Sequence, residues 1–121
     1  MSIPIMPSMT NTKSRMVNAE VEIFVNGIKR DIDPVTILVD LLKPVGYLME
    51  LILNEIALFK SDNVLAPDDK IESVNSNFLG DPTDPDNILD LMSLDSSIPL
   101  DRIHVNVDTI ETSTLYVNLV R

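Results

Sequence analysis

The chain contains no cysteine. Disulfides, thiolate metal sites, iron–sulfur clusters and cysteine nucleophiles are therefore excluded. It has only three glycines, Gly27, Gly46 and Gly80, which are too scattered for a phosphate-binding loop or a dinucleotide fingerprint. Aromatic residues make up 4% of the chain and tryptophan is absent, so the core is expected to be aliphatic.

Catalytic patterns are also missing. His104 is the only histidine, and no Ser-His-Asp or Glu-His motif surrounds it, so we interpret it as a surface or packing residue. Asp81, Asp84 and Asp86 suggest a calcium loop, but the loop glycine and the terminal glutamate of an EF-hand are absent. We therefore expect no enzyme activity, no metal site and no cofactor.

The formal net charge is −10 over 121 residues. Binding to nucleic acid needs clustered Lys and Arg, so this charge argues against it and favours a protein partner with a basic surface. No apolar run reaches the length of a membrane span, and we expect no membrane association. Residues 1–18 lack a continuous apolar core, so a cytoplasmic location is expected; Lys13 and Arg15 leave organelle targeting as an alternative.

The first folded segment reads as a hairpin. Val21, Ile23 and Val25 alternate with polar positions, which is the period of a half-buried strand. Asn26-Gly27 follows directly and predicts a type I′ turn, after which the alternation resumes to Ile32. Phe24, on the polar face, is either a partner contact or a residue covered by the chain's own tail.

The next segments are predicted as a helix and then a strand. Asp33-Pro34 resembles a helix start, and an apolar face follows over 38–45, so a short helix is expected around 38–43. Residues 47–59 fit either a second helix or a buried central strand followed by a short one. We prefer the strands; a two-helix protein is the alternative. Residues 70–74 are predicted to form a further strand.

These segments, in this order, predict an α+β fold of the ubiquitin-like β-grasp type, a mixed sheet packed on one helix. The expected organisation is a disordered leader at 1–18, the β-grasp domain at 19–80, an acidic linker at 81–100 and a C-terminal β-hairpin extension at 101–121. The hairpin is expected from alternation over 103–110 and 114–120, and to pack back onto the domain.

Four stretches resemble the sulfur-carrier branch of the β-grasp fold, the ThiS/MoaD type of thiamine and molybdopterin synthesis, with the thiamine branch closer. They are similar to its opening strand and turn, its helix, its central strand and its final strand: Val21-Glu-Ile-Phe-Val-Asn-Gly27, Thr36-Ile-Leu-Val-Asp-Leu-Leu42, Leu51-Ile-Leu-Asn-Glu-Ile56 and Val64-Leu-Ala-Pro-Asp-Asp-Lys-Ile-Glu-Ser-Val74. The resemblance implies a carrier activated by a ubiquitin-activating-type adenylating enzyme.

Carriers of this family end in Gly-Gly shortly after the final strand. At the equivalent place this chain has only Leu79-Gly80, and forty-one residues follow. The resemblance therefore implies carrier chemistry only if the chain is cut after Gly80.

Two functions are expected from the sequence. One is a sulfur-carrier-like protein of cofactor synthesis with Leu79 and Gly80 as its processed terminus. The alternative is a non-catalytic β-grasp interaction module. The candidate partner surface comprises Phe24, Asp68, Asp69 and Glu72.

Overall fold

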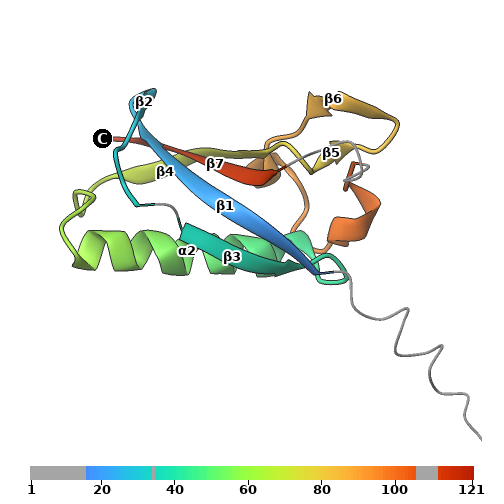
Figure 1. The fold of residues 1–121 in the computed structure, drawn as a ribbon, viewed down its shortest axis with the longest axis horizontal. Helices are drawn as coiled ribbons and strands as arrows, with labels where there is room; N and C mark the ends of the chain where they lie inside the picture. Colours follow the sequence, from blue (N-terminus) through green and yellow to red (C-terminus); the bar gives the residue numbers. More distant parts are fainter. Residues whose placement is uncertain (1–15, 34, 106–111) are drawn as a thin grey trace, which may run out of the picture.

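The computed structural model describes residues 16–33, 35–105 and 112–121, and Figure 1 shows a twisted sheet with one long helix along one face. The fold is thus α+β with a mixed sheet packed on one helix, as the sequence predicted. The elements, in chain order, are β1 (Met16–Val25), β2 (Ile28–Lys29), β3 (Val35–Asp40), α2 (Val45–Ser61), β4 (Lys70–Ser76), β5 (Gly80–Asp81), β6 (Asp84–Ile88), the 3₁₀ turns η1 (Leu91–Ser93) and η2 (Leu100–Arg102), and β7 (Ser113–Val120).

The main sheet has the order β3-β1-β7-β4. β1 is antiparallel to β3 and parallel to β7, and β7 is antiparallel to β4. The short β2 pairs with the end of β1, on the same side as β3. The two longest strands, β1 and β7, therefore lie side by side in the middle, although they come from opposite ends of the sequence (Figure 1).

The predicted opening strand and turn are confirmed. Val21, Ile23 and Val25 are buried within β1, and the residues between them are half-buried. Asn26 and Gly27 have φ values of 52° and 83°, the left-handed pair that a type I′ turn requires. The alternation expected after the turn does not continue, because β2 is only two residues long and both are exposed.

The helix predicted around residues 38–43 is wrong. Val35–Asp40 is strand β3, paired in regular register with Met16–Val21 of β1. β-branched side chains are stiff at χ1 and pack well on a pleated sheet, and this segment contains four of them. They are Val35, Thr36, Ile37 and Val39.

The strand predicted within residues 47–59 is also wrong, because Val45–Ser61 is one helix. Its buried side chains recur every three or four residues and so form one apolar stripe against the sheet. They are Val45, Leu48, Ile52, Ile56 and Phe59. The helical alternative for this segment was correct, but the two-helix protein built on it was not.

Pro44 and Gly46 lie at the start of α2. Pro44 is the N-cap residue in extended conformation. A Cβ on Gly46 would lie 3.2 Å from Cβ and 3.3 Å from O of Ser96, so glycine permits this close approach. The helix ends at Ser61 with Asp62 as its C-cap, and the next residue, Asn63, has a φ of 63°. There the N–H groups of Asn63 and Val64 donate to carbonyls of the last turn, a Schellman motif.

The segment predicted as an acidic linker contributes to the folded unit. The N–H groups of Val45 and Gly46 donate to the carbonyls of Ile98 and Ser96, both at 2.9 Å. Residues 96–98 thus satisfy donors that the first turn of a helix leaves free. Leu91 and Leu100 belong to the core cluster.

The predicted C-terminal hairpin lies partly outside the described residues, which exclude 106–111. β7 does not pair with the described part of its predicted partner strand; it pairs with β1 and β4, and Leu115, Val117 and Leu119 are buried. The final strand therefore packs onto the domain, as expected, but as a central strand. Of the predicted leader, 1–15 lie outside the described residues and Met16–Asn18 belong to β1.

Candidate functional site

The face of the sheet opposite α2 is the candidate site. On β1, Glu20, Glu22 and Phe24 alternate with the residues that pack against the helix. β7 places Thr114 beside Glu20 and Tyr116 beside Glu22. We call the surface formed by Glu20, Glu22, Phe24 and Tyr116 the open face.

Two aromatic residues on the open face contact each other. The ring centroids of Phe24 and Tyr116 lie 6.4 Å apart at an interplanar angle of 52°, a tilted arrangement that aromatic pairs favour. Both residues are half-buried. Phe24 is therefore partly covered by the final strand of its own chain, as one of the two interpretations proposed, and the pair still offers apolar surface to solvent.

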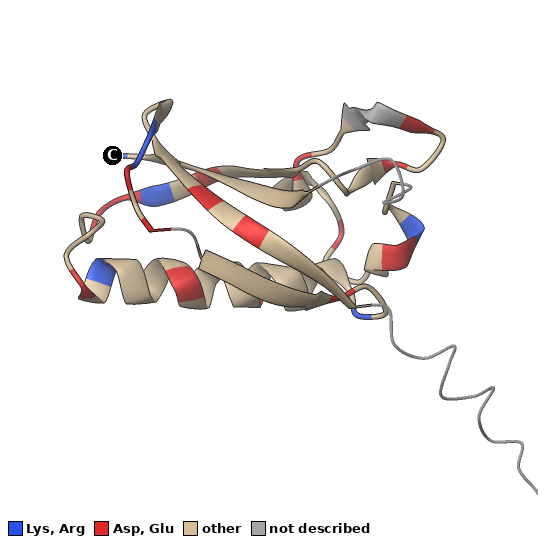
Figure 2. Ribbon diagram, in the orientation of Figure 1, with Lys and Arg blue, Asp and Glu red and all other residues tan. Residues whose placement is uncertain are grey.

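Acidic residues give the open face its charge. Figure 2 shows red segments in the middle of β1, where Glu20 and Glu22 lie. Lys29 is the only cation paired with either carboxylate in the ion pairs of the described residues, and its Nζ is 3.9 Å from Glu22 Oε1. The Lys29 side chain is 60% exposed, so water screens this contact strongly. The open face thus combines two carboxylates with an aromatic pair.

Asp69, predicted as part of a partner surface, is buried at 1% exposure. Its carboxylate accepts hydrogen bonds from the Arg121 guanidinium and from the Ala66 N–H. The Arg121 hydrogen bonds, aided by the Ala66 N–H, hold the pKa of Asp69 below its ordinary value, although desolvation acts the other way. Asp69 is therefore a structural group that ties the end of β7 to the loop before β4.

The other predicted surface acids are accessible. Asp68 is exposed in the turn before β4. Glu72 is exposed in β4, at the point where the pairing register with β7 shifts between Ile71 and Ser73. The sequence-based selection missed Glu20, Glu22 and Tyr116. The alternation of polar and apolar residues around each was a signal for them, but their proximity depends on the parallel pairing of β1 with β7.

The predicted carrier terminus is inside the fold. Leu79 is fully buried and Gly80 is buried as well. The Gly80 N–H donates to the Ile103 carbonyl at 2.6 Å, and Leu79 forms an isolated bridge with His104. The structure therefore places Leu79 and Gly80 away from any free chain end.

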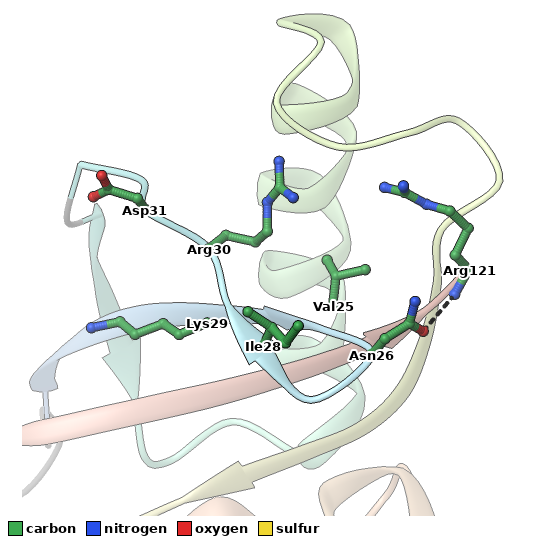
Figure 3. Close-up of a pocket in the computed structure, with 7 residues that line it drawn as sticks. All are labelled: Val25, Asn26, Ile28, Lys29, Arg30, Asp31 and Arg121. Carbon is green, nitrogen blue, oxygen red and sulfur yellow. Dashed lines mark hydrogen bonds between the residues drawn. The ribbon is translucent and has the colours of Figure 1, made fainter.

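A pocket of about 450 Å³ lies beside the β1–β2 turn. Figure 3 shows Arg30 and Arg121 pointing to the same side of it above Val25, whereas Lys29 points away. Arg30 donates to the Val64 carbonyl at 3.3 Å, and Arg121 is paired with Asp69. Both guanidinium groups thus have structural roles in joining the turn to the end of α2 and to the loop before β4.

Within residues 16–33, 35–105 and 112–121, no three His, Asp or Glu side chains gather in a way that could hold a metal ion. None of the helices in these ranges is both long and apolar enough to cross a membrane. No protein-family model matches the chain, and no curated protein matches it.

Proposed function

We propose that this chain is a β-grasp-like protein-interaction module that binds a basic partner through the open face. The sheet order supports the β-grasp assignment. In that fold the first strand lies between the second and the last, and the last lies beside the third. Taking β1, β3, β4 and β7 as these four strands reproduces the order, with α2 between the second and the third.

The chemistry of the open face supports a basic partner. Glu20 and Glu22 attract Lys and Arg, and they lie in a chain of net charge −10. Phe24 and Tyr116 offer a half-buried aromatic surface beside them. Arg can pair with a carboxylate and also stack on an aromatic ring, so an Arg-bearing protein surface fits both groups.

A sulfur carrier of the ThiS/MoaD type is the competing proposal. It rests on the opening strand with the Asn26-Gly27 turn and on the strand predicted at 70–74, two stretches whose structure agrees with the resemblance. It needs a free carboxylate after Gly80, but Gly80 is buried and bonded, and a cut there would remove β7 from the middle of the sheet. Because this cut would remove β7, we choose the interaction module over the carrier. A cytoplasmic location stays a prediction.

The test compares two charge-reversal variants by affinity capture from the native source with quantitative mass spectrometry. Glu20→Lys/Glu22→Lys changes the open face, whereas the matched control Glu50→Lys/Glu55→Lys makes the same change of charge on α2. A partner that wild type and the α2 variant capture equally, and that the open-face variant loses by tenfold or more (about 1.4 kcal/mol), supports the proposal. Equal capture by all three proteins contradicts it.

The carrier is tested separately by the intact mass of the protein purified from its native source, where a protease, an adenylating enzyme and a sulfur donor can all act on it. The interaction module is expected to keep its full-length mass. A species that ends at Gly80 and carries sulfur in place of oxygen would establish the carrier instead.

A further inference from the structure

The two edges of the main sheet differ in how they are covered. On the β4 edge, the Val74 N–H donates to Asp90 Oδ1 at 3.0 Å, and the same oxygen accepts from the Met92 N–H at 3.0 Å. This carboxylate fixes η1 against β4. On the opposite edge, β3 pairs with β1 alone among the residues that the structure describes. Alternate residues of β3 therefore direct their backbone N–H and C=O groups away from the sheet.

β3 also lacks the devices that usually protect an edge strand. Natural edges are interrupted by bulges, proline or lysine, or are very short. Val35–Asp40 contains no lysine or proline, and its six residues pair with β1 without a register shift. Leu38 is 54% exposed on this strand. The edge is thus regular, apolar and open to another strand.

We propose that β3 is a self-association edge, where a second copy of this chain adds its own β3 in antiparallel orientation across a two-fold axis. In such a pair, residues directly opposite each other must point to the same face of the sheet. A register centred on Leu38 places it opposite the partner's Leu38. The same register places Ile37 opposite the partner's Val39 on the face that packs on α2.

Charge favours this register over its neighbours. Asp40 is the only charged residue of β3. With the axis at Leu38, Asp40 lies opposite the partner's Thr36, whose hydroxyl can donate to a carboxylate. An axis at Ile37 would set Leu38 opposite the partner's Thr36, and an axis at Val39 would set it opposite the partner's Asp40, so an apolar side chain would face a polar one in both. An axis at Asp40 would set two carboxylates against each other, and an axis at Thr36 would leave Leu38 opposite a residue outside the strand. The sequence of β3 is thus complementary to itself in one register.

The added strand is therefore β3 of a second copy of this chain, because binding an unrelated peptide would not require the sequence of β3 to be complementary to itself. The net charge of −10 on each copy opposes association at long range, and salt screens that repulsion. The dimer is therefore expected to strengthen as the salt concentration rises. The inference does not rest on the proposed function, since it uses the β3 edge and neither Glu20 nor Glu22.

The absence of cysteine gives a direct test, because a single introduced cysteine is the only one in the chain. Opposite residues of antiparallel strands have Cα atoms about 4.5–5.5 Å apart, which a disulfide can span. Leu38→Cys in the full chain is expected to form a covalent dimer under mild oxidation. Leu53→Cys on α2, where Leu53 is 51% exposed, is the matched control and is expected to cross-link at least tenfold more slowly.

Sedimentation velocity of the wild type and two charged variants completes the test. Wild type is expected to reach twice its 13.5 kDa mass with rising protein and salt concentration. Leu38→Lys and Leu38→Glu are each expected to stay monomeric and to dimerise when mixed, because opposite charges then meet at the axis. A monomeric wild type at every concentration would overturn the proposal. Equal cross-linking of the two cysteine variants, or a dimer that survives Leu38→Lys, would overturn it too.

Discussion

The Arg121 guanidinium donates two hydrogen bonds to the buried carboxylate of Asp69. Nε lies 2.9 Å from Oδ1, and Nη2 lies 3.3 Å from Oδ2. The Arg121 N–H also donates to Asn26 Oδ1 at 3.2 Å. One residue thus joins the end of β7 to the turn after β1 and to the loop before β4. Since β1 and β4 flank β7, these bonds hold three strands together at one end of the sheet.

This ion pair predicts how stability depends on pH. The pKa of Asp69 is lowered in the folded state, chiefly by the Arg121 hydrogen bonds, so the folded state binds the proton less readily than the unfolded chain does. The stabilisation is fully present above the ordinary aspartate pKa and is lost as pH falls through the lowered folded-state value. Asp69→Asn is expected to lower stability at neutral pH and to flatten this acid dependence. Urea midpoints of both proteins between pH 7 and about pH 3 measure it; parallel curves would contradict it.

Asp90 is expected to stabilise the β4 edge. Asp90→Ala removes the acceptor of the Val74 and Met92 N–H groups and should cost about 1–3 kcal/mol. Asp95 is a matched control, because its carboxylate accepts from the N–H and the hydroxyl of Ser97, two residues along the chain. Asp95→Ala should cost less than about 1 kcal/mol. Chemical denaturation measures both changes, and equal losses would show that the contact with β4 contributes nothing.

Asn63 holds the left-handed position that ends α2. Asn63→Gly is expected to keep or raise stability by less than about 1 kcal/mol, because glycine adopts positive φ without a Cβ clash. Asn63→Val should lower it by about 1–2 kcal/mol, because a β-branched residue is strained there. Thermal unfolding of the two variants and of the wild type measures this order of stability. A valine variant as stable as the glycine variant would refute the Schellman assignment.

A chain that ends at Gly80 is expected to be unfolded. It lacks β7, which pairs with both β1 and β4, and with it Leu115, Val117 and Leu119 of the core. It also loses the residues 96–98 that satisfy the first turn of α2. Far-ultraviolet circular dichroism and proton NMR dispersion, beside the full chain, measure this. A folded fragment would restore cleavage after Gly80 as a route to a carrier.

Local chemistry alone was enough to predict the opening of the fold. The alternation of Val21, Ile23 and Val25 and the Asn26-Gly27 turn depend on a few adjacent residues, so β1 and its turn were predicted correctly. The spacing of the apolar residues in α2 also indicated a helix. Residues 47–59 were nonetheless predicted as strands, because the segments that follow complete the order of a β-grasp, although Leu, Met and Glu favour a helix.

The sequence by itself therefore determined the class, an α+β domain with an aliphatic core and an acidic surface. Tertiary structure decided the rest. Residues 38–45 have apolar side chains spaced for a helix, but residues 35–40 pair with β1 and form a strand. The site depends on β7, whose parallel pairing brings Tyr116 to Phe24 and Glu22 across more than ninety residues. No local pattern encodes that pairing, because it is selected by how well many distant side chains fill one core together.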